Sequence, residues 1–235
     1  MKKFFSGLIT IVAFSSVYAQ DSIQSCSFSV NMDVASRYVW RGLLYSDAVN
    51  LQPMATLSWN NFTLGTWASY AVGKSYAEVD FSASWANNGL NIGLNDYCTL
   101  QEPTVPSFQY FNFKKSTTPH AVESYASYQL QGHFPLKLLA SSFIYGYDKD
   151  STGNNYYSSY IELSYPVEIK SISLSFFAGG TLAKGLYANK AGIVNVGFSA
   201  KKEIVITDKY TLPLLFTLTA NPEANYIYST FIISL

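Results

Sequence analysis

Charged residues are scarce in this chain of 235 residues: they make up 13% of it, and the formal net charge is +0. A typical soluble domain carries about twice that share. Without a surplus of Lys and Arg, phosphates could not be neutralised, which argues against a nucleic-acid partner. The chain has two histidines and two cysteines, with no Cys/His cluster and no phosphate-binding glycine loop. The sequence therefore predicts no metal, no cofactor and no nucleic acid.

Long hydrophobic runs are also missing beyond the first twenty residues. The longest later pieces, such as Leu212–Leu218, have the length of a strand, whereas a membrane helix needs about 20 apolar residues. The chain starts with two lysines and a short apolar stretch, followed by small residues up to Ala19. Residues 1–19 are thus predicted to be a cleaved signal peptide, and residues 20–235 the mature domain. An exported chain that spans a membrane without helices must form a closed barrel.

The sequence is rich in hydrophobic residues (49%) and aromatic residues (17%), and they alternate with polar residues at a period of two. Such apolar-out, polar-in strands of about 10 residues are typical of an outer-membrane barrel. The clearest examples are Phe28 to Val34, Leu51 to Trp59, Phe62 to Val72, Ala77 to Trp85 and Leu90 to Leu94. Further strands are expected at Ala121–Leu130, Leu136–Gly146, Tyr156–Tyr165, Ser171–Gly180, Gly192–Lys201, Thr211–Ala220 and Tyr226–Leu235.

The predicted fold is a single all-β antiparallel transmembrane barrel of about twelve strands. Ten or fourteen remain open, because Leu136–Gly146 and Lys202–Tyr210 have ambiguous patterns. Short turns alternate with longer polar connections, as in barrels with short periplasmic turns and long outer loops. Cys26 and Cys98 would lie near opposite ends of the wall, too far apart for a disulfide, so we expect two free, mostly buried thiols.

Aromatic residues are expected to point outward at both ends of the strands, forming two interfacial girdles. The alternative is a soluble β-sandwich, which has no reason to place aromatic residues at both strand ends. The final strand also presents one apolar face. It resembles the last strand of outer-membrane barrels, which usually ends with an aromatic residue that the assembly machinery reads; here Leu235 takes that place. The predicted outer girdle comprises Tyr38, Trp40, Tyr70 and Tyr157, and the inner one comprises Trp59, Phe62, Trp85 and Tyr165.

The segments Ser36-Arg37-Tyr38-Val39-Trp40-Arg41-Gly42, Gly65-Thr66-Trp67-Ala68-Ser69-Tyr70 and Glu78-Val79-Asp80-Phe81 resemble the TorF-type porins. Ser46-Asp47 and Leu51-Gln52-Pro53 add to this likeness. It is clearest from Asn31 to Tyr97 and again from Gly192 to Leu235. The resemblance implies a barrel in the cell outer membrane and a pore. Lipids, lipopolysaccharide and small polar solutes are then the expected partners.

By the same alternation, several charged side chains are expected to face the lumen. A hydrated channel with such a lining would favour cations or polar neutral solutes. Alternatively, Arg37 and Arg41 bridge to the acidic groups Asp33, Glu78 or Asp80, because a small barrel can fill its own interior. These readings can coexist in a narrow pore. The candidate pore-lining residues are Asp33, Arg37, Arg41, Glu78, Asp80, Glu123 and Glu162.

The sequence favours a channel for passive diffusion, with a non-conducting binding or structural barrel as the rival. The long connection Thr99–His120 carries aromatic residues and two lysines, and it either constricts the lumen or packs over the rim. Enzymatic activity is not expected. A lipid hydrolase would need His120 to pair with a serine such as Ser124, and no nucleophile motif supports this. His133 is expected in a short surface turn.

Overall fold

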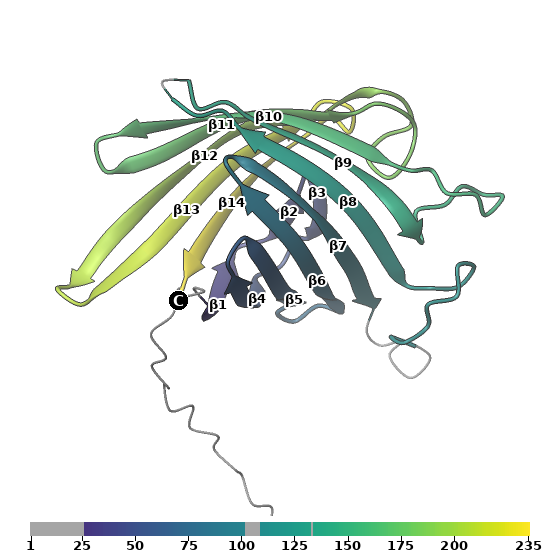
Figure 1. Ribbon diagram of the computed structural model, residues 1–235, viewed down its shortest axis with the longest axis horizontal. Coiled ribbons are helices and arrows are strands. Elements are labelled where there is room, and N and C mark those ends of the chain that lie inside the picture. The colour runs from purple at the N-terminus through teal and green to yellow at the C-terminus, as the bar shows by residue number, and fades with distance from the viewer. Residues whose placement is uncertain (1–25, 102–108, 133) are drawn as a thin grey trace, which may run out of the picture.

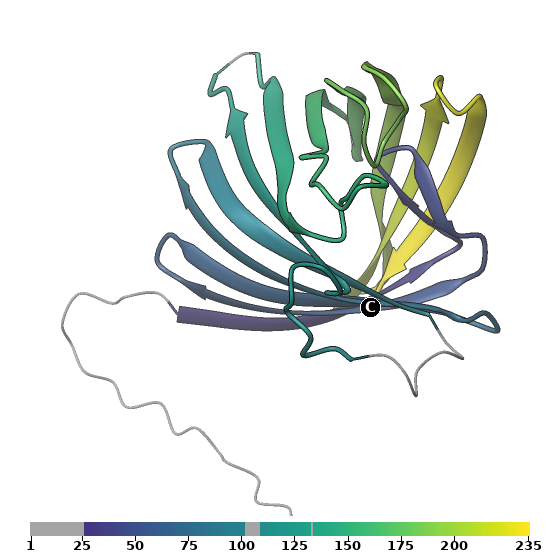
Figure 2. The same ribbon diagram turned by 90° about the vertical axis from the view of Figure 1, so that its right-hand side faces the viewer.

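The computed structural model describes residues 26–101, 109–132 and 134–235 (Figure 1). Within these residues, twelve strands form one closed antiparallel barrel and two further strands form a separate pair. Each wall strand pairs with its neighbours along the chain, and β14 (Tyr226–Ser234) closes the ring against β1 (Cys26–Ala35). Figures 1 and 2 show the end of β14 lying beside β1. The predicted all-β barrel of about twelve strands is confirmed.

The observed wall strands overlap all of the predicted ones. The uncertain segment at Leu136–Gly146 is a strand, and Ile204–Ile206 extends the strand before it rather than forming a long turn. The remaining wall strands are β4 (Asn50–Trp59), β5 (Phe62–Ala71), β6 (Tyr76–Asn87), β7 (Leu90–Gln101), β8 (His120–Gln129), β9 (Lys137–Gly146), β10 (Ser159–Ile169), β11 (Ile172–Thr181), β12 (Gly192–Thr207) and β13 (Tyr210–Asn221).

The two ends of the barrel differ in their connections. At one end, which we call the turn end, two-residue turns join β4 to β5 and β6 to β7, and Asn60 and Asn88 adopt positive φ there. Asn tolerates this backbone region, so the tight turns follow from the sequence. The other end, the loop end, carries the longer connections 147–158 and 182–191.

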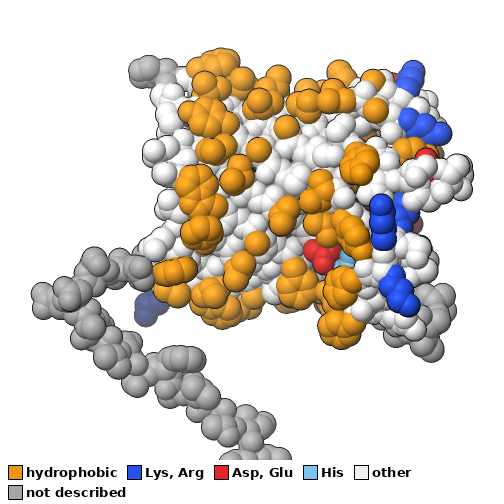
Figure 3. All heavy atoms as spheres, turned by 45° about the vertical axis from the view of Figure 1, so that its right-hand side comes forward, with side chains coloured by type: hydrophobic (Ala, Val, Ile, Leu, Met, Phe, Trp, Pro, Cys, Tyr) orange, Lys and Arg blue, Asp and Glu red, His pale blue; other side chains and the backbone are white. Residues whose placement is uncertain are grey.

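The outer face of the wall is apolar. Alternate residues such as Leu57, Leu64 and Leu94 point away from the barrel interior and are exposed. Figure 3 shows hydrophobic side chains spread over the visible wall, with most of the visible Lys and Arg gathered at the loop end. Tyr70, Tyr157, Trp59 and Phe62 are exposed as predicted for the girdles. A face of this kind is unsuited to water over so large an area.

The prediction that Tyr38 and Trp40 point outward is wrong. After Ala35 the chain leaves the wall, where the N–H of Ser36 donates to the carbonyl of Phe231 at 2.8 Å. It then forms a separate hairpin of two strands, β2 (Tyr38–Trp40) and β3 (Leu43–Ser46), within the barrel. Twelve strands enclose more space than the wall side chains of a small barrel fill, and the aromatic residues of this hairpin occupy part of it.

The two cysteines are free, as expected, but only Cys98 is buried. Cys26 is exposed, because the C-terminal segment 232–235 lies beside β1 only from Met32 to Ala35. Among the described residues, the turn-end half of β1 therefore has β4 as its one neighbour. The predicted signal peptide and the turn position of His133 lie outside the described residues. In the part of the chain that the structure describes, no helix is long and apolar enough to cross a membrane.

Candidate functional site: a hairpin packed across the lumen

Arg41 lies at the tip of the β2–β3 hairpin and reaches the wall almost opposite β1. Its guanidinium donates to both carboxylate oxygens of Glu123 on β8, with Nη1–Oε1 and Nη2–Oε2 distances of 2.5 and 3.1 Å. These paired bonds form the bidentate arginine–carboxylate geometry. The Glu123 side chain is 0% exposed. Because removal of one partner from a buried pair costs about 3–5 kcal/mol, this contact fixes the position of the hairpin tip.

Aromatic rings cover the parts of the Arg41 guanidinium that Glu123 does not contact. The Arg41 Cζ atom lies 4.3 Å from the ring centre of Trp40 and 4.5 Å from that of Tyr160. Tyr160 lies against Gly179 of β11, where a Cβ would overlap the phenol ring. Glycine at this position therefore makes room for the ring. Desolvated cation–π contacts contribute about 2 kcal/mol, so the rings hold Arg41 as well as fill space.

The connection 182–191 between β11 and β12 supplies a second inserted segment. Its buried Tyr187 accepts a hydrogen bond from Arg41 Nη1 at 2.5 Å, and its ring centre lies 5.3 Å from that of Tyr160. Burial raises the pKa of Tyr187 well above its ordinary value, so the hydroxyl stays neutral. We call Trp40, Arg41, Glu123, Tyr160 and Tyr187 the arginine nest.

The backbone of the hairpin tip also contacts the wall directly. Arg41 and Gly42 both have positive φ, 48° and 78°, as a two-residue hairpin turn requires. A Cβ on Gly42 would overlap the carbonyl oxygen of Val194 on β12. Asn221 of β13 donates from Nδ2 to the Gly42 carbonyl at 3.0 Å. The tip is thus held by one backbone contact, one hydrogen bond and the arginine nest.

Beside the hairpin, the loop-end part of the lumen is filled by side chains, and the part closer to the turn end is open. A gap of about 10 Å³ between Tyr45, Glu78, Phe143 and neighbouring rings has room for one water at most. Closer to the turn end, a cavity of about 300 Å³ opens between the hairpin and strands β5 to β7. We call it the aromatic cavity; its lining includes Tyr38, Trp40, Trp67, Asp80, Ser82, Asn95 and Tyr97.

Two predicted site residues, Glu78 and Asp80, lie on this side of the hairpin. Both are inward on β6 and largely buried, 3% and 9% exposed. Glu78 accepts a hydrogen bond from the Tyr76 hydroxyl, and Asp80 accepts one from the Cys98 N–H at 3.3 Å. Among the described residues, no Lys, Arg or His forms an ion pair with either carboxyl group. The expected bridge from Arg41 to these acids is therefore wrong: Arg41 is committed to Glu123.

The remaining candidates are more dispersed. Glu162 accepts hydrogen bonds from Tyr160 at 2.5 Å and from Asn195 at 3.0 Å, next to the arginine nest. Asp33 faces inward on β1, and Arg37 lies at the bend where the chain leaves the wall. The structure therefore brings Arg41, Glu123 and Glu162 together and leaves Glu78 with Asp80 as a second group.

His120 does not meet Ser124. Its Nδ1 lies 2.9 Å from a carboxylate oxygen of Asp96, and its Nε2 lies 2.6 Å from the carbonyl of Tyr110. Ser124 is four residues along the same strand, a separation of about 13 Å, and its hydroxyl lies 3.4 Å from the Ser142 carbonyl. The arrangement that a lipid hydrolase would need is absent from this pair. Instead, His120 attaches the segment 109–119 to the wall.

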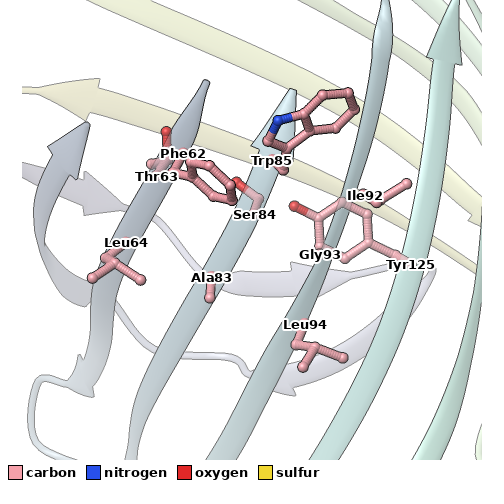
Figure 4. Close-up of a pocket in the computed structure, with 10 residues that line it drawn as sticks. All are labelled: Phe62, Thr63, Leu64, Ala83, Ser84, Trp85, Ile92, Gly93, Leu94 and Tyr125. Atoms are coloured by element: carbon pink, nitrogen blue, oxygen red, sulfur yellow. The ribbon is translucent and has the colours of Figure 1, made fainter. Parts of the chain in front are cut away.

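A further hollow of about 380 Å³ lies in the turn-end part of the wall, between β5 and β8. Figure 4 shows the ring of Tyr125 extending across Gly93, with Leu64, Ala83 and Leu94 nearby. Its lining is mostly apolar and includes no charged residue. It therefore offers a polar solute only the hydroxyl groups of Thr63, Ser84 and Tyr125, whereas the aromatic cavity also offers a carboxyl group.

Sequence reasoning placed Arg41 and Glu123 in the lumen but missed Trp40, Tyr160 and Tyr187 as their partners. One signal could have revealed the hairpin: Arg41-Gly42 lies between two short aromatic runs, and an X-Gly pair between such runs predicts a two-residue turn. No comparable signal marks Tyr187, because it reaches Arg41 across 146 residues of sequence.

The fold and the lumen together define a closed antiparallel β-barrel with a hairpin inserted across its interior. The model of a family described as "Bacterial protein of unknown function (Gcw_chp)" matches residues 19–192, and the chain belongs to this family. No match was found among curated proteins.

Proposed function

We propose that this chain is a barrel of the bacterial outer membrane, with its loop end facing outside and its turn end facing the periplasm. The apolar outer face of the wall supports this, because lipid is the solvent in which such a face is stable. The closed ring of strands also supports a membrane location, because backbone N–H and C=O groups in lipid need hydrogen-bond partners within the sheet. The predicted signal peptide is consistent with export.

We further propose that the barrel is a gated channel for small polar solutes, closed in this state by the β2–β3 hairpin. One observation carries the proposal: within the described part of the chain, the two strands of the hairpin pair only with each other and form a sheet separate from the wall. Side-chain contacts and a few tip bonds hold it in place, so it can leave the lumen without breaking the barrel. The resemblance to TorF-type porins also implies a pore.

A non-conducting binding barrel is the second candidate. It is favoured by the close packing of the hairpin against the wall, which leaves a gap of about 10 Å³ near Tyr45 and Phe143. On this reading the hairpin is a permanent plug, and the lumen serves as a binding chamber that opens at the turn end alone.

Single-channel recording in planar bilayers distinguishes the two candidates. The wild-type chain is compared with a variant in which residues 37–49 are replaced by a short Asn-Gly turn. Ala35 and Asn50 are register partners on adjacent strands, so a tight turn can join them. Resistance to protease in the membrane serves as the check that the variant is folded.

The gated channel predicts brief, small openings for the wild type and steady, larger conductance for the hairpin-deleted variant. A folded hairpin-deleted barrel that gives no conductance would refute the channel and leave the binding barrel. A wild-type chain with steady conductance equal to that of the variant would refute the gate.

A further inference from the structure

Trp40 lies between two buried acidic groups in the lumen. They differ in whether a cation of the chain is paired with them. The arginine nest contains a buried carboxylate, Glu123, and the cation that neutralises it, Arg41, held against aromatic rings. The aromatic cavity shares the Trp40 ring and contains a buried carboxylate, Asp80. Here no cation from the described residues is paired with the carboxylate. The first environment is filled by the chain itself, and the second is left open.

The space in the aromatic cavity matches a small organic molecule. Its volume of about 300 Å³ is at the lower end of the range for ligand pockets, about 300–1,000 Å³. Tyr38, Trp67 and Tyr97 supply ring faces and edges, and the Tyr38 and Trp67 ring centres lie 5.3 Å apart. Peptides and nucleic acids are too large for this space, and an anion would meet the Asp80 carboxyl group.

The cavity lining favours an organic ammonium ion over a metal ion. Aromatic rings attract a cation through their quadrupole and are the usual recognition device for quaternary ammonium groups. A hard metal ion instead takes six or more oxygen ligands, and most of the cavity lining is aromatic carbon. Ser82 and Asn95 are register partners, two residues along β6 from Asp80 toward the turn end, and their hydroxyl and amide groups can bind a hydroxyl group on the ligand.

We propose that the aromatic cavity is a binding site for a small organic ammonium cation, with the carboxyl pair of Asp80 and Glu78 as the counter-ion and Trp40, Trp67 and Tyr97 as the cage. Glu78, two residues along the same face of β6, shares a side-chain hydrogen bond with Asp80, so one of the two carboxyl groups holds a proton and the pair offers one negative charge to the ligand. The site goes beyond the proposed channel function and does not depend on it, because binding requires no passage through the lumen.

Choline is the probe, and its uncharged carbon isostere 3,3-dimethyl-1-butanol is the control ligand. Both are titrated into the purified full-length barrel in detergent, and binding is followed by tryptophan fluorescence and by calorimetry. Trp40 and Trp67 line the cavity, so the proposal predicts saturable quenching by choline and at least tenfold weaker binding of the isostere. Equal binding of both ligands, or no saturable binding of choline, would overturn it.

Two variants test the residues. The double variant Asp80→Asn with Glu78→Gln removes the charge of the hydrogen-bonded pair and is expected to weaken choline binding about tenfold or more. Trp67→Leu removes a cage wall while both carboxyl groups remain, with a similar expected loss. Glu203→Gln, in an exposed ion pair with Lys201, is the matched control and should bind like the wild type. Should the double variant fail to fold, Trp67→Leu alone decides: unchanged choline affinity in that folded variant contradicts the site.

Discussion

The loop-end and turn-end halves of the lumen are built by the same strands but differ in packing. At the loop end, inward side chains such as Asn50, Ser69 and Glu123 are buried beneath the hairpin. At the turn end, inward positions such as Glu168 on β10 and Ser173 on β11 are exposed although both strands have two neighbours. The same strands carry alternating polar and apolar residues through both halves. The difference therefore comes from the chain inserted into one half, and not from the wall.

The largest difference between the two halves is expected in the free energy of unfolding that is lost when a glutamate with an ion-pair partner is replaced. Glu123→Gln leaves Arg41 buried without its counter-ion and should lower the free energy of unfolding by about 3–5 kcal/mol. Glu203→Gln breaks the exposed pair with Lys201 near the turn end and should cost below about 1 kcal/mol. Urea unfolding in micelles, followed by tryptophan fluorescence, measures both. Equal losses would show that the loop-end pair is not buried in the folded barrel.

Glycines at positive φ provide the next comparison. Gly42→Ala would strain the backbone and also force a Cβ against the Val194 carbonyl, with an expected loss of about 2–4 kcal/mol. Gly73→Ala has the same kind of backbone strain but open space around it, so about 1 kcal/mol is expected. The same unfolding experiment compares them. If Gly42→Ala is no more harmful than Gly73→Ala, the tip does not touch β12.

The smallest difference in unfolding free energy is expected between the replacements of two asparagines, one in each half. Asn221→Ala removes the hydrogen bond to the Gly42 carbonyl and should cost about 1 kcal/mol. Asn31→Ala changes an exposed inward residue at the turn end and should stay within about 0.5 kcal/mol of the wild type. A larger loss of unfolding free energy for Asn31→Ala than for Asn221→Ala would contradict the tighter packing of the loop-end half.

The wall could be predicted from the sequence because a period of two directly encodes which residues face inward. The hairpin could not, since Tyr38 and Trp40 continue the outward parity of Phe28 to Val34, and the bend at Ser36 leaves no mark in that pattern. Alternation also does not give the partner of an inward charge: Arg41 pairs with Glu123 and not with Asp33, Glu78 or Asp80. Arg41 and Glu123 are 82 positions apart, and alternation gives no information on which inward groups meet across the lumen.

Thiol accessibility from outside the cell tests most directly whether the hairpin closes the lumen. Thr56, an inward residue on β4 toward the turn end, is changed to Cys in a chain whose own cysteines are replaced by Ser. A charged, membrane-impermeant thiol reagent is then added to intact cells that express either the full chain or the hairpin-deleted variant. If the hairpin closes the lumen, the thiol at position 56 is labelled rapidly in the hairpin-deleted barrel and little in the full chain. Equally rapid labelling in both would contradict that closure.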